Sequence, residues 1–115
     1  MKGETTMREI TKATKNFTKK MVINSRNGIP MQDNVGNIMV VAAAVMTDTD
    51  EETGEPKDVG VIVTSDKTFM TCISATIIDT LPDLIDIVDE EGETEVRIDK
   101  RKSKGGRDFL TLTIY

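Results

Sequence analysis

The chain has 115 residues, a length typical of one domain, and a formal net charge of −5. It contains no histidine and one cysteine, Cys72, which excludes an intrachain disulfide framework and removes the usual general base and neutral metal ligand. It also lacks a Gly-rich phosphate loop, paired-cysteine metal spacing and a nucleophile elbow, so we expect no enzyme, no cofactor and no small-molecule substrate.

Residues 1–15 are polar and show no periodic pattern. They lack the apolar core of a signal peptide, no stretch reaches the apolar length of a membrane span, and a lone cysteine fits a reducing compartment. We therefore expect a cytoplasmic protein with no membrane partner. Residues 1–15 are predicted to form a flexible N-terminal arm, a candidate for self-association, or a short added strand. Residues 16–115 are predicted to form one domain.

The first part of this domain is predicted to hold two strands separated by a loop. Residues 17–24 alternate between two faces, which indicates a strand. Residues 25–36 contain two glycines and a proline and are predicted to form a loop. Residues 37–46 are almost continuously apolar. A buried helix is the alternative there, but three valines favour a strand with small side chains on one face.

A third strand and, after a tight turn, a further short strand are predicted next. Residues 47–57 form an acidic segment with a glycine and a proline, typical of a hairpin loop. Residues 58–64 read as a strand, residues 65–67 as a tight turn and residues 68–72 as a short strand.

An amphipathic helix is predicted to follow, with Ser74 as its N-cap. Apolar residues recur at three- and four-residue steps, and the segment 89–92 should end the helix. Pro82 should kink or split it, because proline removes a backbone donor. The apolar face consists of Ile73, Ile77, Ile78, Leu81, Leu84, Ile85 and Val88, and the opposite face carries Asp79, Asp83 and Asp86.

Two alternating strands, residues 94–100 and 108–115, are predicted to close the chain as a hairpin. In the first, Val96 and Ile98 should face inward and Arg97 outward. The turn between the strands is basic, since residues 100–107 hold five cations. In the second strand, Leu110, Leu112 and Ile114 share one face, and Phe109, Thr111, Thr113 and Tyr115 share the other.

Charge is segregated along the sequence. Cations dominate residues 8–26 and 97–107, whereas carboxylates dominate residues 48–58 and 79–95. Local fields rather than the total charge steer a polyanion, because the Debye length at physiological salt is only about 8 Å. The basic turn therefore indicates a surface that faces nucleic acid. The alternative is that each charged run is simply a solvated face.

The element order, three strands, a helix and two strands, is that of an OB-fold: a mainly β, five-stranded Greek-key barrel with one helix between strands 3 and 4. OB-folds bind oligonucleotides across strands 2 and 3 and through the loops that join strands 1–2 and 4–5. On this assignment the basic turn is the 4–5 loop, and the 1–2 loop carries Arg26. The carboxylates would then lie away from the ligand. The alternative is a small β-barrel of unrelated role with a chance basic turn.

Residues 59–88 carry a more specific signal. Ile73-Ser74 is followed by a helix that contains Asp83-Leu84-Ile85-Asp86-Ile87-Val88, and the chain ends with Ser103-Lys104-Gly105 before Phe109 and the alternating Leu112 and Ile114. This pattern resembles the single-stranded DNA-binding proteins of tailed Bacillus phages that replicate by protein priming. The resemblance covers residues 24–115, more weakly over residues 24–46. It implies an OB-fold type protein that binds single-stranded DNA.

The chain departs from that family at its base-stacking tyrosines. Met70 stands where one is expected and Thr47 where another is, and the chain has only four aromatic residues. We therefore expect weaker binding, or binding in which Met70, Phe109 and arginine planes replace the tyrosines. Phe17 and Phe69 have core packing as their alternative role. The predicted DNA-binding residues are Lys19, Lys20, Arg26, Met70, Arg97, Lys100, Arg101, Lys102, Lys104, Arg107, Phe109 and Tyr115.

Two functions are compatible with these observations. The first is sequence-independent binding and protection of single-stranded DNA during viral DNA replication. The second is an acidic protein-interaction module, or a DNA mimic, that places the surface of residues 79–95 in a basic cleft on a host protein. Only the first predicts direct oligonucleotide binding that salt weakens.

Overall fold

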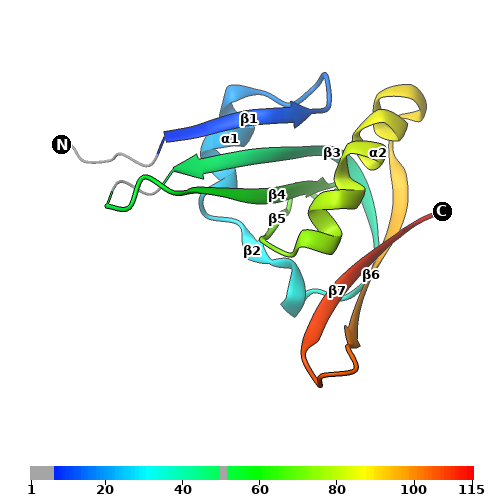
Figure 1. The fold of residues 1–115 in the computed structure, drawn as a ribbon. Helices are drawn as coiled ribbons and strands as arrows, with labels where there is room; N and C mark the ends of the chain where they lie inside the picture. Colours follow the sequence, from blue (N-terminus) through cyan, green and yellow to red (C-terminus); the bar gives the residue numbers. More distant parts are fainter. Residues whose placement is uncertain (1–6, 50–51) are drawn as a thin grey trace.

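The computed structural model describes residues 7–49 and 52–115. The strands form one curled sheet, a half-barrel, and two helices lie against it (Figure 1). The chain is therefore mainly β, as the sequence predicts. The strands are β1 (Met7–Ala13), β2 (Ile29–Pro30), β3 (Gly36–Thr49), β4 (Pro56–Thr64), β5 (Phe69–Cys72), β6 (Thr94–Lys102) and β7 (Asp108–Ile114). The two α-helices are α1 (Lys19–Ser25) and α2 (Ala75–Glu91), and η1 (Met31–Asp33) is a short 3-10 turn.

The long strand β3 organises the sheet, whose order is β2-β5-β4-β3-β6-β7. Its first residues, 36–40, pair with β6, and its last, 44–49, pair with β1, while β4 runs along the other edge. The β3–β4 register shifts between Val40 and Ala42. Such a bulge bends a strand and increases its twist, so one strand can serve two differently oriented parts of the sheet.

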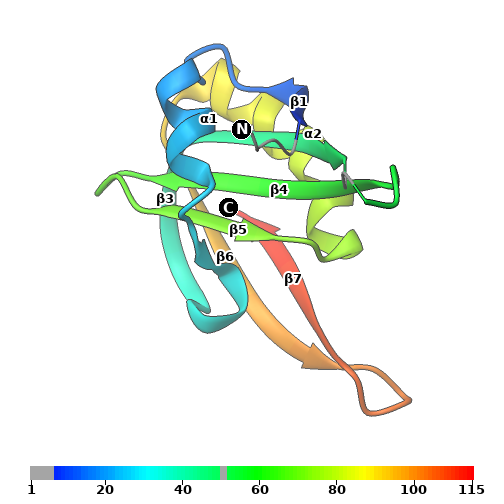
Figure 2. The same ribbon diagram turned by 90° about the vertical axis from the view of Figure 1, so that its left-hand side faces the viewer.

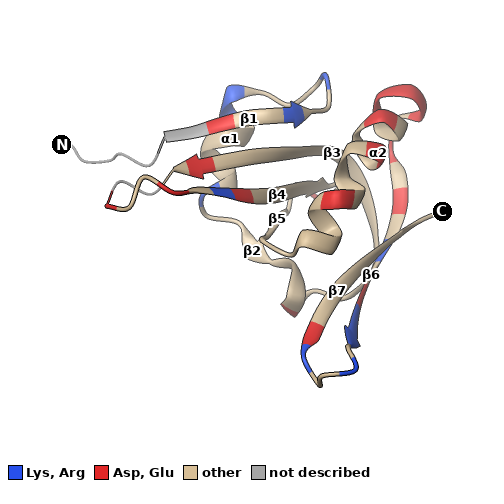
Figure 3. Cartoon of the chain, in the orientation of Figure 1, with Lys and Arg blue, Asp and Glu red and all other residues tan. Residues whose placement is uncertain are grey.

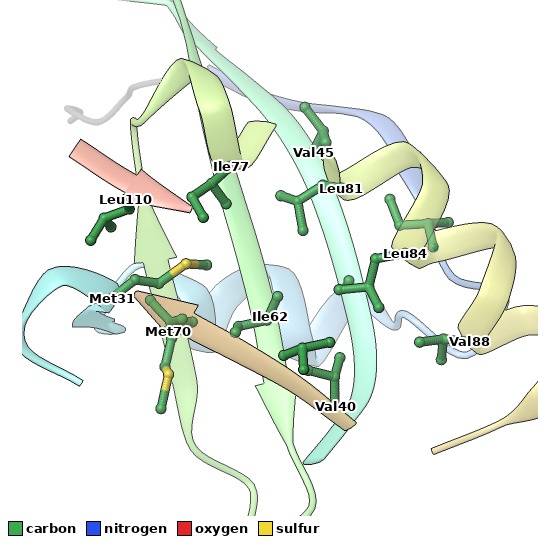
Figure 4. Packing of buried hydrophobic residues seen from close by; sticks show 14 residues of the cluster. Met31, Val40, Val45, Ile62, Met70, Ile77, Leu81, Leu84, Val88 and Leu110 are labelled. Carbon is green, nitrogen blue, oxygen red and sulfur yellow. The ribbon is translucent and has the colours of Figure 1, made fainter. Parts of the chain in front are cut away.

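Alternating side chains of β3 and β4 build two separate apolar layers. Ala43, Val45 and Ile62 point into the main core, which α2 covers with Leu81 and its neighbours (Figure 4). The opposite face carries a smaller cluster of Ala44, Met46, Val59 and Val61, on which Ala13, Phe17, Val22 and Phe69 pack. Helix α1 covers this second face (Figure 2).

Helix α2 packs closely on the sheet because Gly60 of β4 has no side chain. A Cβ there would lie 2.5 Å from Cδ1 of Leu81. The expected break at Pro82 does not occur, since α2 is one helix from residue 75 to residue 91. The apolar face that contains Leu81 holds the helix against the sheet despite the missing backbone donor. Ser74 is the N-cap residue, as predicted, but its side chain makes no capping hydrogen bond.

The strand predicted for residues 17–24 is wrong, because the structure has helix α1 there. The side chain of Thr18 accepts a hydrogen bond from the backbone N–H of Met21 and so caps the helix. Phe17 and Val22 then pack on the second apolar face. The apolar residues at 17, 21, 22 and 23 fit a helical turn as well as an alternating strand, and the apolar face beside them favours the helix.

The remaining differences follow from how the sheet is completed. Of the two alternatives for residues 1–15, the described part forms a strand, β1, which pairs with β3 and so joins the sheet of the predicted domain; residues 1–6 lie outside the described residues. The predicted loop 25–36 contains β2 and η1, and β2 pairs in parallel with β5. The described residues thus form seven strands rather than the five predicted, and α2 follows the fifth of them.

Candidate nucleic-acid interface

The hairpin formed by β6 and β7 extends beyond the rest of the molecule (Figures 1 and 2). Its strands pair in register from Val96 with Ile114 to Lys102 with Asp108. The turn is held by two backbone hydrogen bonds, from Ser103 N to Arg107 O at 2.9 Å and from Gly106 N to Ser103 O at 3.0 Å. Gly106 has φ +82°, which a glycine adopts without strain.

The far half of this hairpin is a cationic tip. Its residues 100–108 are all exposed to solvent, and no ion pair reaches its five cations within residues 7–49 and 52–115. Their charge is therefore available to a ligand. The tip cations are Lys100, Arg101, Lys102, Lys104 and Arg107, the five that the sequence places together.

Arg97 belongs to a different environment on the same hairpin. Its Nε lies 2.9 Å from Oδ1 of Asp99, and its Nη1 donates to Oδ1 of Asn37 at 3.3 Å. The Asp99 carboxylate, through this hydrogen bond and its charge, raises the pKa of Arg97 above its ordinary value. Tyr115, 65% exposed, pairs with Glu95 through a backbone hydrogen bond beside this network. Arg97 and Tyr115 thus lie at the base of the hairpin, among carboxylates.

A cleft of about 470 Å³ opens beside the tip, at the seam between β7 and the end of β5. Four parts of the chain meet there: β2 with η1, the start of β4, the end of β5 and the start of β7. Phe109, half-buried, and Ile73, 62% exposed, supply apolar surface to it. The lining residues are Pro30, Met31, Gln32, Val59, Thr71, Cys72, Ile73, Ser74, Asp108, Phe109 and Leu110.

Sequence reasoning missed most of this cleft. Of its lining residues, only Phe109 is among the predicted site residues. The others come from segments predicted as loop, strand or helix start, and no spacing in the sequence links them. The apolar residue Ile73 immediately before the predicted N-cap Ser74, and so outside the helix, is the local sequence signal that could have pointed to them.

Three predicted site cations do not join the hairpin. Lys19 and Lys20 lie on α1 and Arg26 follows it, all exposed, on the second face of the sheet. The segment around Arg26, predicted to be the 1–2 loop on the same binding side as the basic turn, therefore does not lie beside the hairpin. Figure 3 shows the two groups of cations apart, α1 at the top and the hairpin tip at the bottom.

Met70 is also misplaced by the prediction. It is 6% exposed and points into the main core, beside Met31 and Ile62 (Figure 4). Its neighbour Phe69 packs on the opposite face, against the α1 cluster. Side chains alternate along a strand, so once α1 covers Phe69, Met70 must point inward. A base cannot lie on Met70 in this arrangement.

Carboxylates gather on other parts of the surface (Figure 3). They follow the exposed face and the C-terminal end of α2 and the loop between β3 and β4. Two contacts tie the helix to the N-terminal segment: Lys12 Nζ lies 3.0 Å from Asp86 Oδ1, and the backbone N–H of Lys15 donates to Asp89 Oδ1 at 2.8 Å. Asp108 is the one carboxylate among residues 100–108.

Neither helix of residues 7–49 and 52–115 has the length and apolar character needed to cross a membrane. The same residues contain no group of three or more His, Cys, Asp or Glu side chains that could hold a metal ion. The hairpin itself presents exposed cations beside a partly apolar cleft.

Comparison with known proteins agrees with this chemistry. No curated protein and no solved structure shows a significant match to the chain. The model of one family, described as phage single-stranded DNA-binding protein, matches residues 7–115, nearly the whole sequence. Because the match includes the hairpin, α2 and the half-barrel, the chain belongs to the family of phage single-stranded DNA-binding proteins and binds single-stranded DNA in phage replication.

Proposed function

We propose that the cationic tip of the β6–β7 hairpin is the surface that holds the sugar–phosphate backbone of single-stranded DNA. The observation that carries the proposal is the exposure of five cations on the hairpin tip, with no ion pair to any of them in the described residues. Lysine and arginine side chains on a backbone contact read charge and not sequence. Binding through this tip is therefore independent of sequence and protects whichever strand replication displaces.

The proposal also assigns the OB-like part of the sheet. Strands β3, β4 and β5, then α2, then β6 and β7 follow the order of an OB-fold, with β1, α1 and β2 as additions. Strands β3, β4 and β5 are then strands 1, 2 and 3 of the OB-fold, the places predicted for residues 17–24, 37–46 and 58–64. In this assignment the basic turn remains the 4–5 loop, but the acidic β3–β4 loop becomes the 1–2 loop. We accordingly assign DNA contact to the tip and not to that acidic loop.

Arg97, Tyr115 and the α1 cations are left out of the proposed interface. Arg97 already pairs with Asp99, and Tyr115 lies at its side near Glu95. Lys19, Lys20 and Arg26 lie on the other side of the sheet. The proposal places this binding in the host cytoplasm, where a phage DNA-replication protein acts.

The test is a quadruple substitution of Arg101, Lys102, Lys104 and Arg107 to alanine. Each cation engaged with a single strand adds about 0.7 to the salt exponent, so loss of four should weaken binding to labelled oligo-dT by roughly 100- to 1,000-fold at 0.1 M salt. Exposed cations contribute little to stability, so circular dichroism and the melting temperature should stay unchanged.

The matched control replaces Lys19, Lys20 and Arg26 with alanine, which removes three exposed cations far from the tip. This variant should bind oligo-dT within a few-fold of the unmodified protein. Equal losses in the two variants would show that total charge, and not the hairpin tip, sets the affinity. Unchanged affinity in the quadruple variant would refute the assignment outright.

A further inference from the structure

The cleft beside the tip lies where the half-barrel stays open. β7 pairs with β6 on one edge, and no other strand of the described chain pairs with its second edge. That free edge, with the end of β5 and with η1, frames the cleft. A volume of about 470 Å³ falls within the range of small-ligand sites, roughly 300–1,000 Å³. Unpaired backbone groups along the edge can hydrogen-bond to a ligand.

The register of the hairpin places the cleft next to the tip cations. Phe109 and Leu110 line the cleft, and they stand opposite Arg101 and Lys100 on β6. Residues directly opposite each other on paired strands have Cβ atoms about 5 Å apart. A DNA backbone held by the tip therefore passes close to the mouth of the cleft, at about the spacing between two neighbouring strands.

The lining of the cleft suits an uncharged flat group better than a phosphate. Phe109, Ile73 and Pro30 give it apolar walls, and 62% of the Ile73 surface is exposed to water. Burial raises the pKa of the Cys72 thiol to about 11, so this lining group stays neutral at physiological pH. The carboxylate of Asp108 at the rim would repel a phosphate but can accept a hydrogen bond from an N–H.

Polar groups for the edge of such a ligand are present as well. Gln32, Thr71 and Ser74 line the cleft. The Ser74 side chain does not cap α2, so its hydroxyl is not committed to the helix. Side-chain amides and hydroxyls of this kind can donate to or accept from any base. The cleft therefore combines a stacking wall with hydrogen-bonding groups that tolerate different bases.

From these observations we infer that the cleft between β7, β5 and η1 receives an unstacked nucleobase of the strand that the tip holds. Phe109 provides the stacking surface and Ile73 further apolar surface. This inference rests on the proposed function. It assigns a base-binding role to residues that carry no charge, and it compensates for the aromatic residues that the chain lacks elsewhere.

The experiment compares an oligo-dT with an oligonucleotide of equal length in which every base is replaced by an abasic site. The measured quantity is the ratio of the two dissociation constants. In the unmodified protein, stacking of one base makes this ratio roughly 5- to 150-fold. The double variant Phe109→Ala, Ile73→Ser should lower the ratio toward one by weakening only the binding of oligo-dT. Thermal melting verifies that the variant is folded.

Tyr115→Ala is the matched control, since it removes an exposed aromatic ring from the same row of the hairpin but outside the cleft. It should keep the full ratio. A ratio that collapses in Tyr115→Ala and persists in the double variant would place the base beside Tyr115, outside the cleft, and overturn the inference. Equal binding of both oligonucleotides by the unmodified protein would also overturn it, with the tip proposal intact. Failure of the unmodified protein to bind oligo-dT would instead refute the proposed function.

Discussion

The base and the tip of the β6–β7 hairpin belong to the same two strands but differ in burial and charge. At the base, Val96 and Ile98 are fully buried and pack with Leu112 and Ile114 in the main core. At the tip, residues 100–108 are exposed and carry five cations. Apolar burial stabilises the fold, whereas exposed charge contributes little to stability and much to attraction of a polyanion. The same pair of strands thus has a buried base, which holds the hairpin in the core, and an exposed tip, whose cations can bind a ligand.

The largest effect is expected at the base. Ile98→Ala should destabilise the protein by roughly 2–5 kcal/mol, because it leaves a cavity opposite Leu112 in the main core. The free energy of unfolding in urea measures this loss. The folded fraction should still bind oligo-dT with unchanged affinity. An unchanged unfolding midpoint would mean that the base of the hairpin does not anchor it.

Lys100 and Leu110 form the cross-strand pair at the boundary between the two halves, one exposed and one 7% exposed. Leu110→Ala should cost roughly 2–4 kcal/mol of stability. Lys100→Ala should leave the melting temperature in place and weaken oligo-dT binding by roughly 5-fold at 0.1 M salt, the share of one phosphate contact. If Lys100→Ala lowers the melting temperature as much as Leu110→Ala does, the boundary is drawn in the wrong place.

Gly106 tests whether the turn geometry matters to the tip. Its φ of +82° disfavours any residue with a Cβ, so Gly106→Ala should cost about 1 kcal/mol, although nothing lies within 4 Å of the added methyl group. Urea unfolding can resolve a loss of this size. Gly105→Ala is the control, because its backbone does not have positive φ. Similar losses in both variants would contradict a conformational cause.

The β4–β5 turn gives the smallest effect and a contrast to the charged tip. Hydrogen bonds from Thr64 and Thr68 lower the pKa of Asp66 below its ordinary value. A carboxylate with a lowered pKa stabilises the folded state at neutral pH, and this contribution disappears as pH falls through that pKa. Asp66→Asn should therefore lower the melting temperature slightly at pH 7. In acid, the variant and the unmodified protein should have the same melting temperature. A gap that persists at low pH would contradict this.

The parts of the fold predicted best are those with one dominant period. α2 follows from its apolar steps at three and four residues, and β6, β7 and the basic turn follow from alternation around glycines. The prediction for residues 17–24 was wrong because their apolar positions fit two periods. Only the second apolar face of β3 and β4, which α1 covers, decides between them. Tertiary packing, not local propensity, makes that choice.

The candidate site divides in the same way. The five tip cations could be predicted because they are contiguous in the sequence. Met70 could not be placed, since its direction depends on α1 covering its neighbour Phe69. The cleft could not be predicted either, because Gln32, Ile73 and Phe109 come together only through the curl of the sheet.

The salt dependence of oligo-dT binding tests the central claim most directly, because it counts the cations that meet phosphates. With three to five tip cations engaged, the log–log slope of affinity against salt should be about −2 to −3.5 for the unmodified protein. In the Arg101, Lys102, Lys104 and Arg107 quadruple variant it should shrink to a value between about −0.7, the share of Lys100 alone, and zero. Slopes that are equal in the two proteins would contradict the account, since the phosphates would then be held elsewhere.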